Sequence, residues 1–412
     1  MRTSLNKRVF LLVMAGAIIM ATGASIAAAS PRTVLANTGV CQPSSVKRFH
    51  IDGWLHRCGT VIVDSLRRQV RPLSFEVNNL VVGAGDEAAA ECGHWSMPPD
   101  ALYGQIKAWG FNSVELMVTW ANLEPTPPTV NENGTLTHHW DQAYLDALDE
   151  IIANFHAQGI SVILAMLQSR WSPAFRNLTL PNGSVQTCGI GMPPWLYPDG
   201  GGIRKMVAAE LRFFKNQTAY ANTGVQRLFT VAWRELAARY LTNSAVIGSV
   251  LLFEAYDILA QPYPGTSTLR PSDLRLASFY EHVGNAVHEA NRHLLLTFND
   301  RYDGGTGFAV TRKPRLPNAV YSMEFYASHW LPDGLQKLQI YEGRGHGWGL
   351  PVWIGEFTAF NHTRLNPDIP RAEDWQLYTM KLLTWCRKHY VGWALAGQPD
   401  AELAAILTEY GH

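Results

Sequence analysis

The chain has 412 residues, a formal net charge of zero at pH 7, and 17% charged residues. It contains no basic run, so its charge pattern excludes nucleic acid and anionic membrane surfaces as the expected partners. Fourteen tryptophans are present. Because a flat indole stacks well on a sugar ring, this composition favours a carbohydrate ligand.

The N-terminus predicts export. Arg2, Lys7 and Arg8 precede an apolar stretch over residues 9–29 that ends in small residues, which indicates a signal peptide over residues 1–30. The apolar stretch is long, so an uncleaved membrane anchor is the alternative. In both cases the remainder faces the outside. We therefore expect a secreted protein, or one anchored to the membrane and facing outward.

The chain has five cysteines. Export would place them in an oxidising compartment, where disulfides form. In an exported protein an even subset can pair, and we predict one disulfide between Cys41 and Cys58 and a second between Cys92 and Cys188. Cys386 lies in an apolar helix and is predicted to be a buried free thiol. No spacing among the cysteines indicates a zinc site.

Strand and helix signals alternate through the body of the chain. An N-terminal extension over residues 31–72 is predicted to include a hairpin that covers a barrel floor, and the main domain is predicted over residues 73–412. Strands are predicted over residues 73–82, 113–119, 160–167, 246–254, 293–298, 319–326, 351–357 and 390–396. Helices are predicted over residues 99–109, 141–157, 226–240, 272–290 and 372–389. This order indicates an α/β fold, a (β/α)8 barrel. The alternative is an open doubly wound sheet, but no glycine-rich phosphate loop follows any strand.

Two glutamates stand at the ends of apolar runs that are typical of buried parallel strands. Glu254 follows the run at residues 246–253, and Glu356 lies in the run at residues 351–357. In an α/β barrel, a carboxylate at the carboxyl end of a strand faces the mouth, where such folds keep their chemistry. Glycosidic bond cleavage requires two such carboxylates. Each glutamate alone has the alternative of ending a strand or capping a helix, but the pair favours catalysis.

Further motifs accompany these glutamates. A Gly-Phe-Asn-Ser-Val run at residues 110–114 is followed by Trp120 and by Leu-Glu-Pro at residues 123–125, and Gly-Glu-Phe stands at residues 355–357. Together these segments, within about residues 52–396, resemble the cellulase-like family 5 glycoside hydrolases and their clan of retaining (β/α)8 glycosidases.

The resemblance implies a role for three residues. Glu254 would be the acid/base, Glu356 the nucleophile, and Tyr326 a hydrogen-bond donor to that nucleophile. In a retaining mechanism Glu356 attacks the anomeric carbon while Glu254 protonates the leaving oxygen and then activates water, with the two carboxyls about 5–5.5 Å apart. Neither role needs a metal or an organic cofactor. The expected substrate is an oligo- or polysaccharide of the β-linked glucan or mannan type, and the protein is expected to be a monomer.

The sequence departs from the family around these glutamates. Phe253 stands where the family has an Asn that holds the sugar 2-hydroxyl, Glu115 where it has an Arg that steadies the nucleophile, and Glu324 where it has a His. A stacking Trp late in strand eight is replaced by Ala396. These departures support an alternative function, a catalytically inactive barrel that binds carbohydrate or cell wall. An esterase is a third hypothesis, but no Gly-x-Ser-x-Gly elbow occurs.

Other residues are predicted to contact the sugar. Trp120, Trp171 and Trp330 are candidates for stacking on sugar rings, with ordinary packing as the alternative. Asn299 and Asp300 end the fifth strand and are candidates to hold sugar hydroxyls, with a turn cap as the alternative.

Glu115, Glu324 and Glu356 are predicted to crowd one region and to belong to the substrate site. Because like charges this close do not all ionise, at least one should hold a proton near neutral pH. A neutral Glu115 would then donate a hydrogen bond to Glu356 in place of the lost Arg. The alternative is that Arg170 or Arg301, from neighbouring loops, supplies the missing positive charge.

Overall fold

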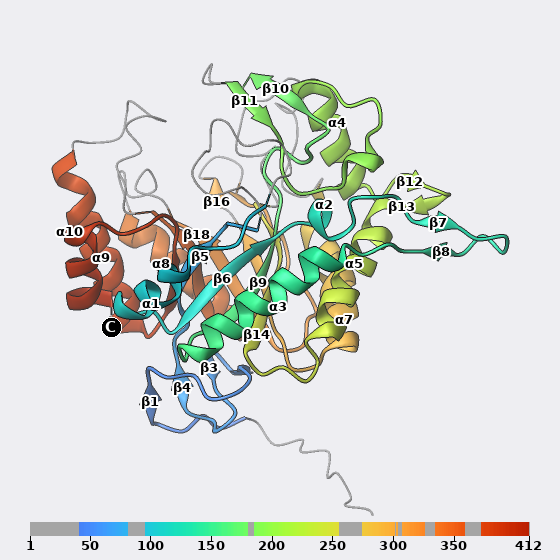
Figure 1. Ribbon diagram of the computed structural model, residues 1–412. Helices are drawn as coiled ribbons and strands as arrows, with labels where there is room; N and C mark the ends of the chain where they lie inside the picture. Colours follow the sequence, from blue (N-terminus) through green and yellow to red (C-terminus); the bar gives the residue numbers. More distant parts are fainter. Residues whose placement is uncertain are drawn as a thin grey trace, which may run out of the picture. The chain divides into compact units, whose positions relative to one another are not determined.

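Eight parallel strands close into a barrel in the computed structural model (Figure 1). The strands follow one another around the barrel in chain order, and β20 pairs with β5 to close it. They are β5 (Leu73–Val77), β6 (Ser113–Val118), β9 (Ser161–Leu167), β14 (Val246–Phe253), β15 (Leu295–Asp300), β18 (Ala319–Glu324), β19 (Val352–Phe357) and β20 (Gly392–Leu395). The structure describes residues 41–80, 95–179, 185–254, 274–300, 302–303, 307–325, 334–358 and 372–411.

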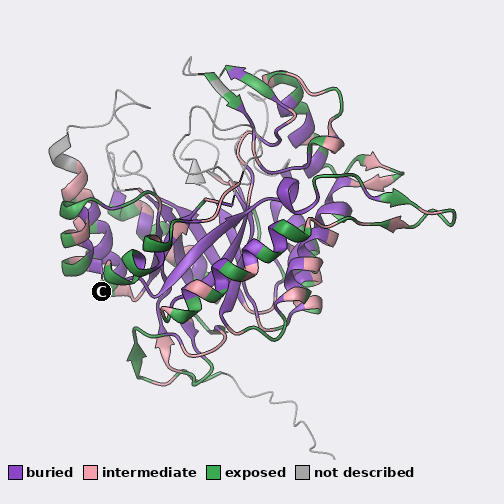
Figure 2. Ribbon diagram, viewed as in Figure 1, coloured by how far each residue is buried: buried purple, intermediate pink, exposed green. Residues whose placement is uncertain are grey.

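The predicted (β/α)8 barrel is confirmed, and the alternative of an open sheet is wrong because the sheet closes. Each predicted strand corresponds to one observed strand, although most observed strands are shorter. Every residue of β6, β14, β15, β18 and β19 is buried. Figure 2 shows the reason: the strands are covered, while exposed residues lie on the outer faces of surrounding helices such as α3.

Five helices were predicted and are observed. They are α1 (Asp100–Ala108), α3 (Gln142–Ala157), α5 (Val225–Arg239), α7 (Leu276–Ala290) and α9 (Ala372–His389). The sequence did not predict α2 (Trp120–Leu123), α4 (Ile203–Phe214), α8 (Gly334–Gly347), α10 (Ala401–Ile406) or the π-helical turn at Leu407–Gly411. The sequence of α8 contains four glycines, which weaken any helical signal.

A small sheet covers the amino-terminal end of the barrel strands. Where a hairpin was predicted, the structure has four strands in the order β1, β4, β3, β2: β1 (Lys47–Arg48), β2 (His56–Cys58), β3 (Val61–Val63) and β4 (Gln69–Val70). Ile62 and Val70 of this sheet, with Ile51 and Leu55 from the segment between β1 and β2, share one apolar cluster with barrel residues that include Ile163 and Ile247. This cluster is the apolar core inside the barrel, and it extends to Phe253 at the carboxyl end of β14.

An additional lobe interrupts the alternation of strands and helices after β9. It contains the antiparallel pair β10 (Arg176–Thr179) and β11 (Val185–Cys188), a 3-10 helix (Pro194–Leu196) and α4. In Figure 1 this lobe lies at the end of the barrel opposite β1. Shorter pairs elsewhere are β7 (Thr129–Val130) with β8 (Leu136–Thr137), β12 (Thr218–Tyr220) with β13 (Thr223–Gly224), and β16 (Tyr302–Asp303) with β17 (Gly307–Phe308).

Four of the five cysteines lie among the described residues. Cys41 and Cys58 form the predicted disulfide, and Cys386 is the predicted buried free thiol. Cys188 is also disulfide-bonded, whereas Cys92, its predicted partner, lies outside the described residues. The predicted signal peptide or anchor over residues 1–30 lies outside them as well. Within the described ranges, no helix is both long and apolar enough to cross a membrane.

Candidate active site

A Ser-x-Glu pattern recurs on three barrel strands. The pairs are Ser74 with Glu76 on β5, Ser113 with Glu115 on β6, and Ser322 with Glu324 on β18. The residues that alternate with them pack in the cluster that includes the outer helices. Because successive strand residues point to opposite faces, the serines and glutamates face the barrel interior. Ser74 Oγ lies 2.7 Å from Ser113 Oγ, which agrees with this direction.

Glu76 and Glu115 stand side by side in this interior. They are register partners on neighbouring parallel strands. Neighbouring strands in a sheet lie about 4.8 Å apart. Glu115 is fully buried, and neither of its carboxyl oxygens has a hydrogen-bond partner. Glu76 is half-buried as a residue, but its Oε2 atom is enclosed and also has no partner.

This burial changes the ionisation of both carboxyls. Burial raises the pKa of Glu115 well above its ordinary value, and the charges of Glu76 and Glu324 raise it further. Burial, with the charge of Glu324, raises the pKa of Glu76 to about 8. Glu76 therefore keeps a proton at pH 7, and the protonated form of Glu115 is favoured for the same reasons, because the charged form loses its solvation and faces like charge.

Glu324 and Glu356 form a second pair at the carboxyl ends of β18 and β19. They are register partners after a shift in the pairing between Met323 and Glu324. Both glutamates are nearly buried, with 7% and 8% of their surface exposed. Gly355 belongs to this arrangement, since a Cβ atom there would lie 2.3 Å from Ser322 Oγ. The predicted proximity of Glu324 to Glu356 is thus confirmed.

The predicted hydrogen bond from Glu115 to Glu356 is wrong, because Glu115 makes no hydrogen bond. Strands β5 and β20 separate β6 from β19 around the barrel, so Glu115 meets Glu76 first. Sequence reasoning missed Glu76. The repeated Ser-x-Glu pattern would have indicated it. The alternative role of Arg170 stays a prediction, and Arg301 lies outside the described residues.

Asn299 and Asp300 point in opposite directions at the end of β15. Asn299 Nδ2 donates to Glu324 Oε1 over 3.4 Å, so Asn299 joins the acidic cluster, and its contact with sugar hydroxyls stays a prediction. Asp300 is fully buried and accepts hydrogen bonds from the Tyr321 hydroxyl at 2.6 Å and the Val310 N–H at 2.7 Å. Its predicted role in holding sugar hydroxyls is wrong. Asp300 instead links β15 to Tyr321 of β18 and to the backbone at Val310.

Glu254 follows β14 directly, with a left-handed backbone whose φ is 53°. This conformation costs a non-glycine residue about 1–3 kcal/mol, and such strain concentrates at functional sites. Gln168, which is fully buried after β9, donates a hydrogen bond from Nε2 to the Glu254 carbonyl oxygen. Sequence reasoning did not assign Gln168 this role. Phe253 belongs to the apolar cluster inside the barrel, so it offers no hydrogen bond to a sugar.

Trp120 and Trp171 pack as core residues. Neither has exposed surface. The indole N–H of Trp120 donates to Glu124 Oε2 at 2.9 Å, and that of Trp171 donates to the Tyr197 hydroxyl at 2.7 Å. The prediction that these rings stack on sugar does not fit this placement, because protein atoms cover both rings. Ordinary packing, the alternative, fits it.

Two predicted site residues, Tyr326 and Trp330, lie outside the described residues, and their roles stay predictions. Among the residues that are described, no group of three or more His, Cys, Asp and Glu side chains is placed to hold a metal ion. The described part of the site consists of the carboxyls of Glu76, Glu115, Glu324 and Glu356 from four strands, with Asn299 beside Glu324. Glu254 follows a fifth strand.

Comparisons with known proteins agree with the barrel fold. The family model Cellulase (glycosyl hydrolase family 5) matches residues 82–398. A crystal structure of an endogalactoceramidase superposes with a TM-score of 0.62 at 20% sequence identity, covering 84% of this chain and 74% of that one. The lactosyl-enzyme intermediate of endo-glycoceramidase II from Rhodococcus sp. gives a TM-score of 0.59 at 20% identity, covering 86% and 80%. No curated protein sequence matches the chain.

Proposed function

The chain belongs to glycosyl hydrolase family 5, and on that premise we propose that it is a retaining O-glycosyl hydrolase. In this proposal Glu254 is the acid/base and Glu356 is the nucleophile. One observation carries it. The two glutamates stand at the carboxyl ends of β14 and β19 in a closed barrel, the end where barrel enzymes place their catalytic residues.

The reaction proceeds in two displacements. Glu356 attacks the anomeric carbon as its bond to the leaving oxygen breaks, and Glu254 donates a proton to that oxygen. Glu254 then removes a proton from water, which attacks the glycosyl-enzyme and frees Glu356. The related Rhodococcus enzyme has been solved as a lactosyl-enzyme intermediate, which supports a covalent step of this kind.

The acidic cluster suits this chemistry through its protonation. If Glu76, Glu115 and Glu324 were all ionised, they would raise the proton affinity of Glu356 and suppress its attack. Protons on Glu76 and Glu115 reduce that repulsion, which favours the ionised form that a nucleophilic Glu356 needs. In the family an Arg steadies the ionised nucleophile with its positive charge. Here the protonated forms of Glu76 and Glu115 would help only by removing negative charge.

The proposed substrate is a β-linked glycan of the glucan or mannan type or a related glycoconjugate. The similar structures bear the names endogalactoceramidase and endo-glycoceramidase, so a glycosylceramide belongs in the substrate panel. We also propose that the protein is exported and monomeric. The Cys41–Cys58 disulfide supports export, since such bonds persist in oxidising compartments. Mass spectrometry of the mature N-terminus would test cleavage after the predicted signal.

The direct test is hydrolysis by the purified full chain. Aryl β-glucoside, β-mannoside and β-galactoside, β-glucan, mannan and a glycosylceramide would be assayed, and the first-formed anomer read by proton NMR. The proposal expects release from at least one substrate with retention of configuration. Glu356→Gln is the matched inactive control, and Glu150→Gln, an exposed site on α3, is the matched neutral control.

A carbohydrate-binding barrel without activity is the second candidate. It is favoured by Phe253, Glu115 and Glu324 at positions where the family has Asn, Arg and His. Affinity electrophoresis on the same polysaccharides separates the two candidates. Retardation that is equal for the wild type and Glu356→Gln, with no hydrolysis of any substrate, would support binding alone.

A further inference from the structure

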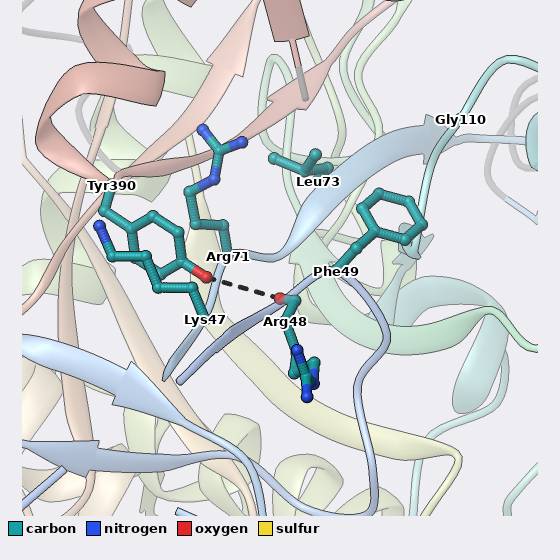
Figure 3. A pocket seen from close by; sticks show the side chains of 7 residues that line it. All are labelled: Lys47, Arg48, Phe49, Arg71, Leu73, Gly110 and Tyr390. Atoms are coloured by element: carbon teal, nitrogen blue, oxygen red, sulfur yellow. Dashed lines mark hydrogen bonds between the residues drawn. The ribbon is translucent and has the colours of Figure 1, made fainter. Parts of the chain in front are cut away.

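A pocket of about 470 Å³ lies beside the floor of the barrel (Figure 3). Arg71, which precedes β5, and Tyr390, which follows α9, line it together with β1. These positions lie at the amino-terminal ends of the barrel strands, so the pocket is at the opposite end from Glu254 and Glu356. Its volume falls within the range of roughly 300–1,000 Å³ that small-molecule sites occupy.

Arg71 is a buried cation with an unused donor. Only 7% of its surface is exposed. Nη2 donates to the Gly411 carbonyl oxygen at 3.2 Å, whereas Nη1 is buried without any hydrogen-bond partner. No described carboxylate forms an ion pair with this guanidinium. A buried charge normally has an opposite charge beside it, because its lost solvation is otherwise uncompensated.

A second cation gathers at the same wall. Lys47 Nζ lies 4.3 Å from the centroid of the Tyr390 ring, and Arg71 Cζ lies 5.3 Å from it. Tyr390 is held there by a left-handed backbone with φ of 58° and by a hydrogen bond from its hydroxyl to the Gln69 carbonyl oxygen at 2.9 Å. In Figure 3 the charged ends of Lys47 and Arg71 both lie beside this ring, and that of Arg48 points away.

The opposite wall of the pocket is apolar. Leu73 is buried, and Phe49 has 49% of its surface exposed, which is high for so large an apolar side chain. Figure 3 shows both on the side of the pocket away from Tyr390. The pocket is therefore lined mainly by hydrocarbon, with Lys47 and Arg71 on one side, and none of its lining residues is acidic.

We propose that this pocket binds an organic anion, a carboxylate or a phosphate or sulfate monoester carried on an apolar body. The anionic group accepts a hydrogen bond from the Lys47 ammonium and balances the uncompensated charge of the Arg71 guanidinium behind the same wall. The apolar body lies against Phe49 and Leu73, where it covers surface that water now contacts. A neutral molecule leaves the guanidinium unpaired, and an inorganic anion leaves the apolar wall exposed.

Calorimetric titration of the full chain tests this with six-carbon probes that share one body. The probes are sodium hexanoate, hexyl phosphate, 1-hexanol and hexylammonium, with acetate and inorganic phosphate as anions without the body. We expect hexanoate or hexyl phosphate to bind at one site at least about tenfold more tightly than hexanol and acetate, since a charged hydrogen bond contributes a factor of this size. Whichever head group binds more tightly identifies the anion.

Variants place the binding at this pocket. Lys47→Ala is on the surface, so it keeps the fold, and Arg71→Gln removes the buried charge. Each should weaken the preferred probe by about tenfold. Arg67→Ala removes an equal charge from an exposed position of the same N-terminal region and should change nothing. The proposal is overturned if no six-carbon anion binds, if hexanol or inorganic phosphate binds equally well, or if Lys47→Ala binds like the wild type.

Discussion

Glu76 and Glu115 are register partners on β5 and β6, and alternation along both strands turns their side chains into the barrel. Two carboxyls at neighbouring positions, away from water, cannot both ionise near neutral pH. Neither Glu115 oxygen has a hydrogen-bond partner that would favour ionisation. The pair therefore binds protons inside the barrel whose mouth carries the proposed nucleophile, Glu356.

This proton binding makes stability depend on pH. The folded pKa values of Glu76 and Glu115 lie above the ordinary value of 4.5, so between pH 4.5 and about 8 the folded protein binds protons that the unfolded chain releases. Stability from this source is complete below pH 4.5 and is lost as pH rises through about 8. Each group contributes a slope of up to about 1.4 kcal/mol per pH unit. Glu115→Gln should flatten the profile of unfolding free energy measured in urea from pH 5 to 8. If the unfolding free energy of Glu115→Gln falls with pH as steeply as that of Glu150→Gln, the raised pKa of Glu115 is contradicted.

Glu356→Gln should lower turnover by a factor on the order of 10⁴ or more, because an amide has no anionic oxygen to attack the anomeric carbon. The substitution is nearly isosteric, so the thermal midpoint should stay close to that of the wild type. Steady-state kinetics and circular dichroism check both halves. Substantial activity in this variant would remove Glu356 as the nucleophile.

Glu254→Ala should show a loss that depends on the leaving group. Dinitrophenolate departs without a proton, so dinitrophenyl glycosides should form the glycosyl-enzyme at a rate near that of the wild type. Unactivated alkyl glycosides should be turned over at least about 100-fold more slowly. Pre-steady-state release of dinitrophenol measures the first step. An equal and total loss on both substrates would argue against Glu254 as the acid.

Trp171→Ala should act on stability rather than on sugar affinity. Trp171 is fully buried and packs edge-on against Phe213 of α4 with ring centroids 5.0 Å apart. Removing so large a core side chain costs about 3–5 kcal/mol, and urea unfolding measures that loss. Trp171→Phe, which keeps most of the apolar volume, should cost less. Unchanged stability with weaker substrate binding would restore the sugar-stacking hypothesis.

Cys58→Ser should destabilise the N-terminal sheet. The Cys41–Cys58 bond closes a loop with a sequence separation of 17 residues, and a cross-link of this length stabilises the folded state by about 3 kcal/mol. The loss is measured by thermal unfolding without reductant. Addition of reductant should lower the midpoint of the wild type by more than that of the variant, because the variant retains only the disulfide of Cys188.

Much of the barrel was predictable because its strands are short apolar runs and its helices have apolar residues at helical spacing. The glycines of α8 weaken its helical signal, whereas α4 does have apolar residues at helical spacing, which sequence reasoning overlooked. Within the site, sequence reasoning found Glu115, Glu324 and Asn299 but missed Glu76. It followed the family's pattern of residues, and that pattern assigns nothing to Glu76.

The errors in the site have one physical origin. Trp120, Trp171 and Asp300 are residue types that bind sugars when they are open to solvent, and a sequence does not show which atoms cover them. Here the indole N–H groups of the two tryptophans and the Asp300 carboxylate are used by neighbouring protein groups. Burial and partner choice depend on contacts between segments distant in sequence, such as Asp300 with Tyr321.

The most direct test of the proposed mechanism is to trap the covalent intermediate. The full chain would be incubated with a dinitrophenyl 2-deoxy-2-fluoroglycoside of the sugar that the hydrolysis panel selects. It would then be digested for peptide mass spectrometry. The account predicts one glycosyl adduct per chain, on the peptide that contains Glu356, and no adduct in Glu356→Gln. An adduct on another residue, or product of inverted configuration with no adduct, would contradict it.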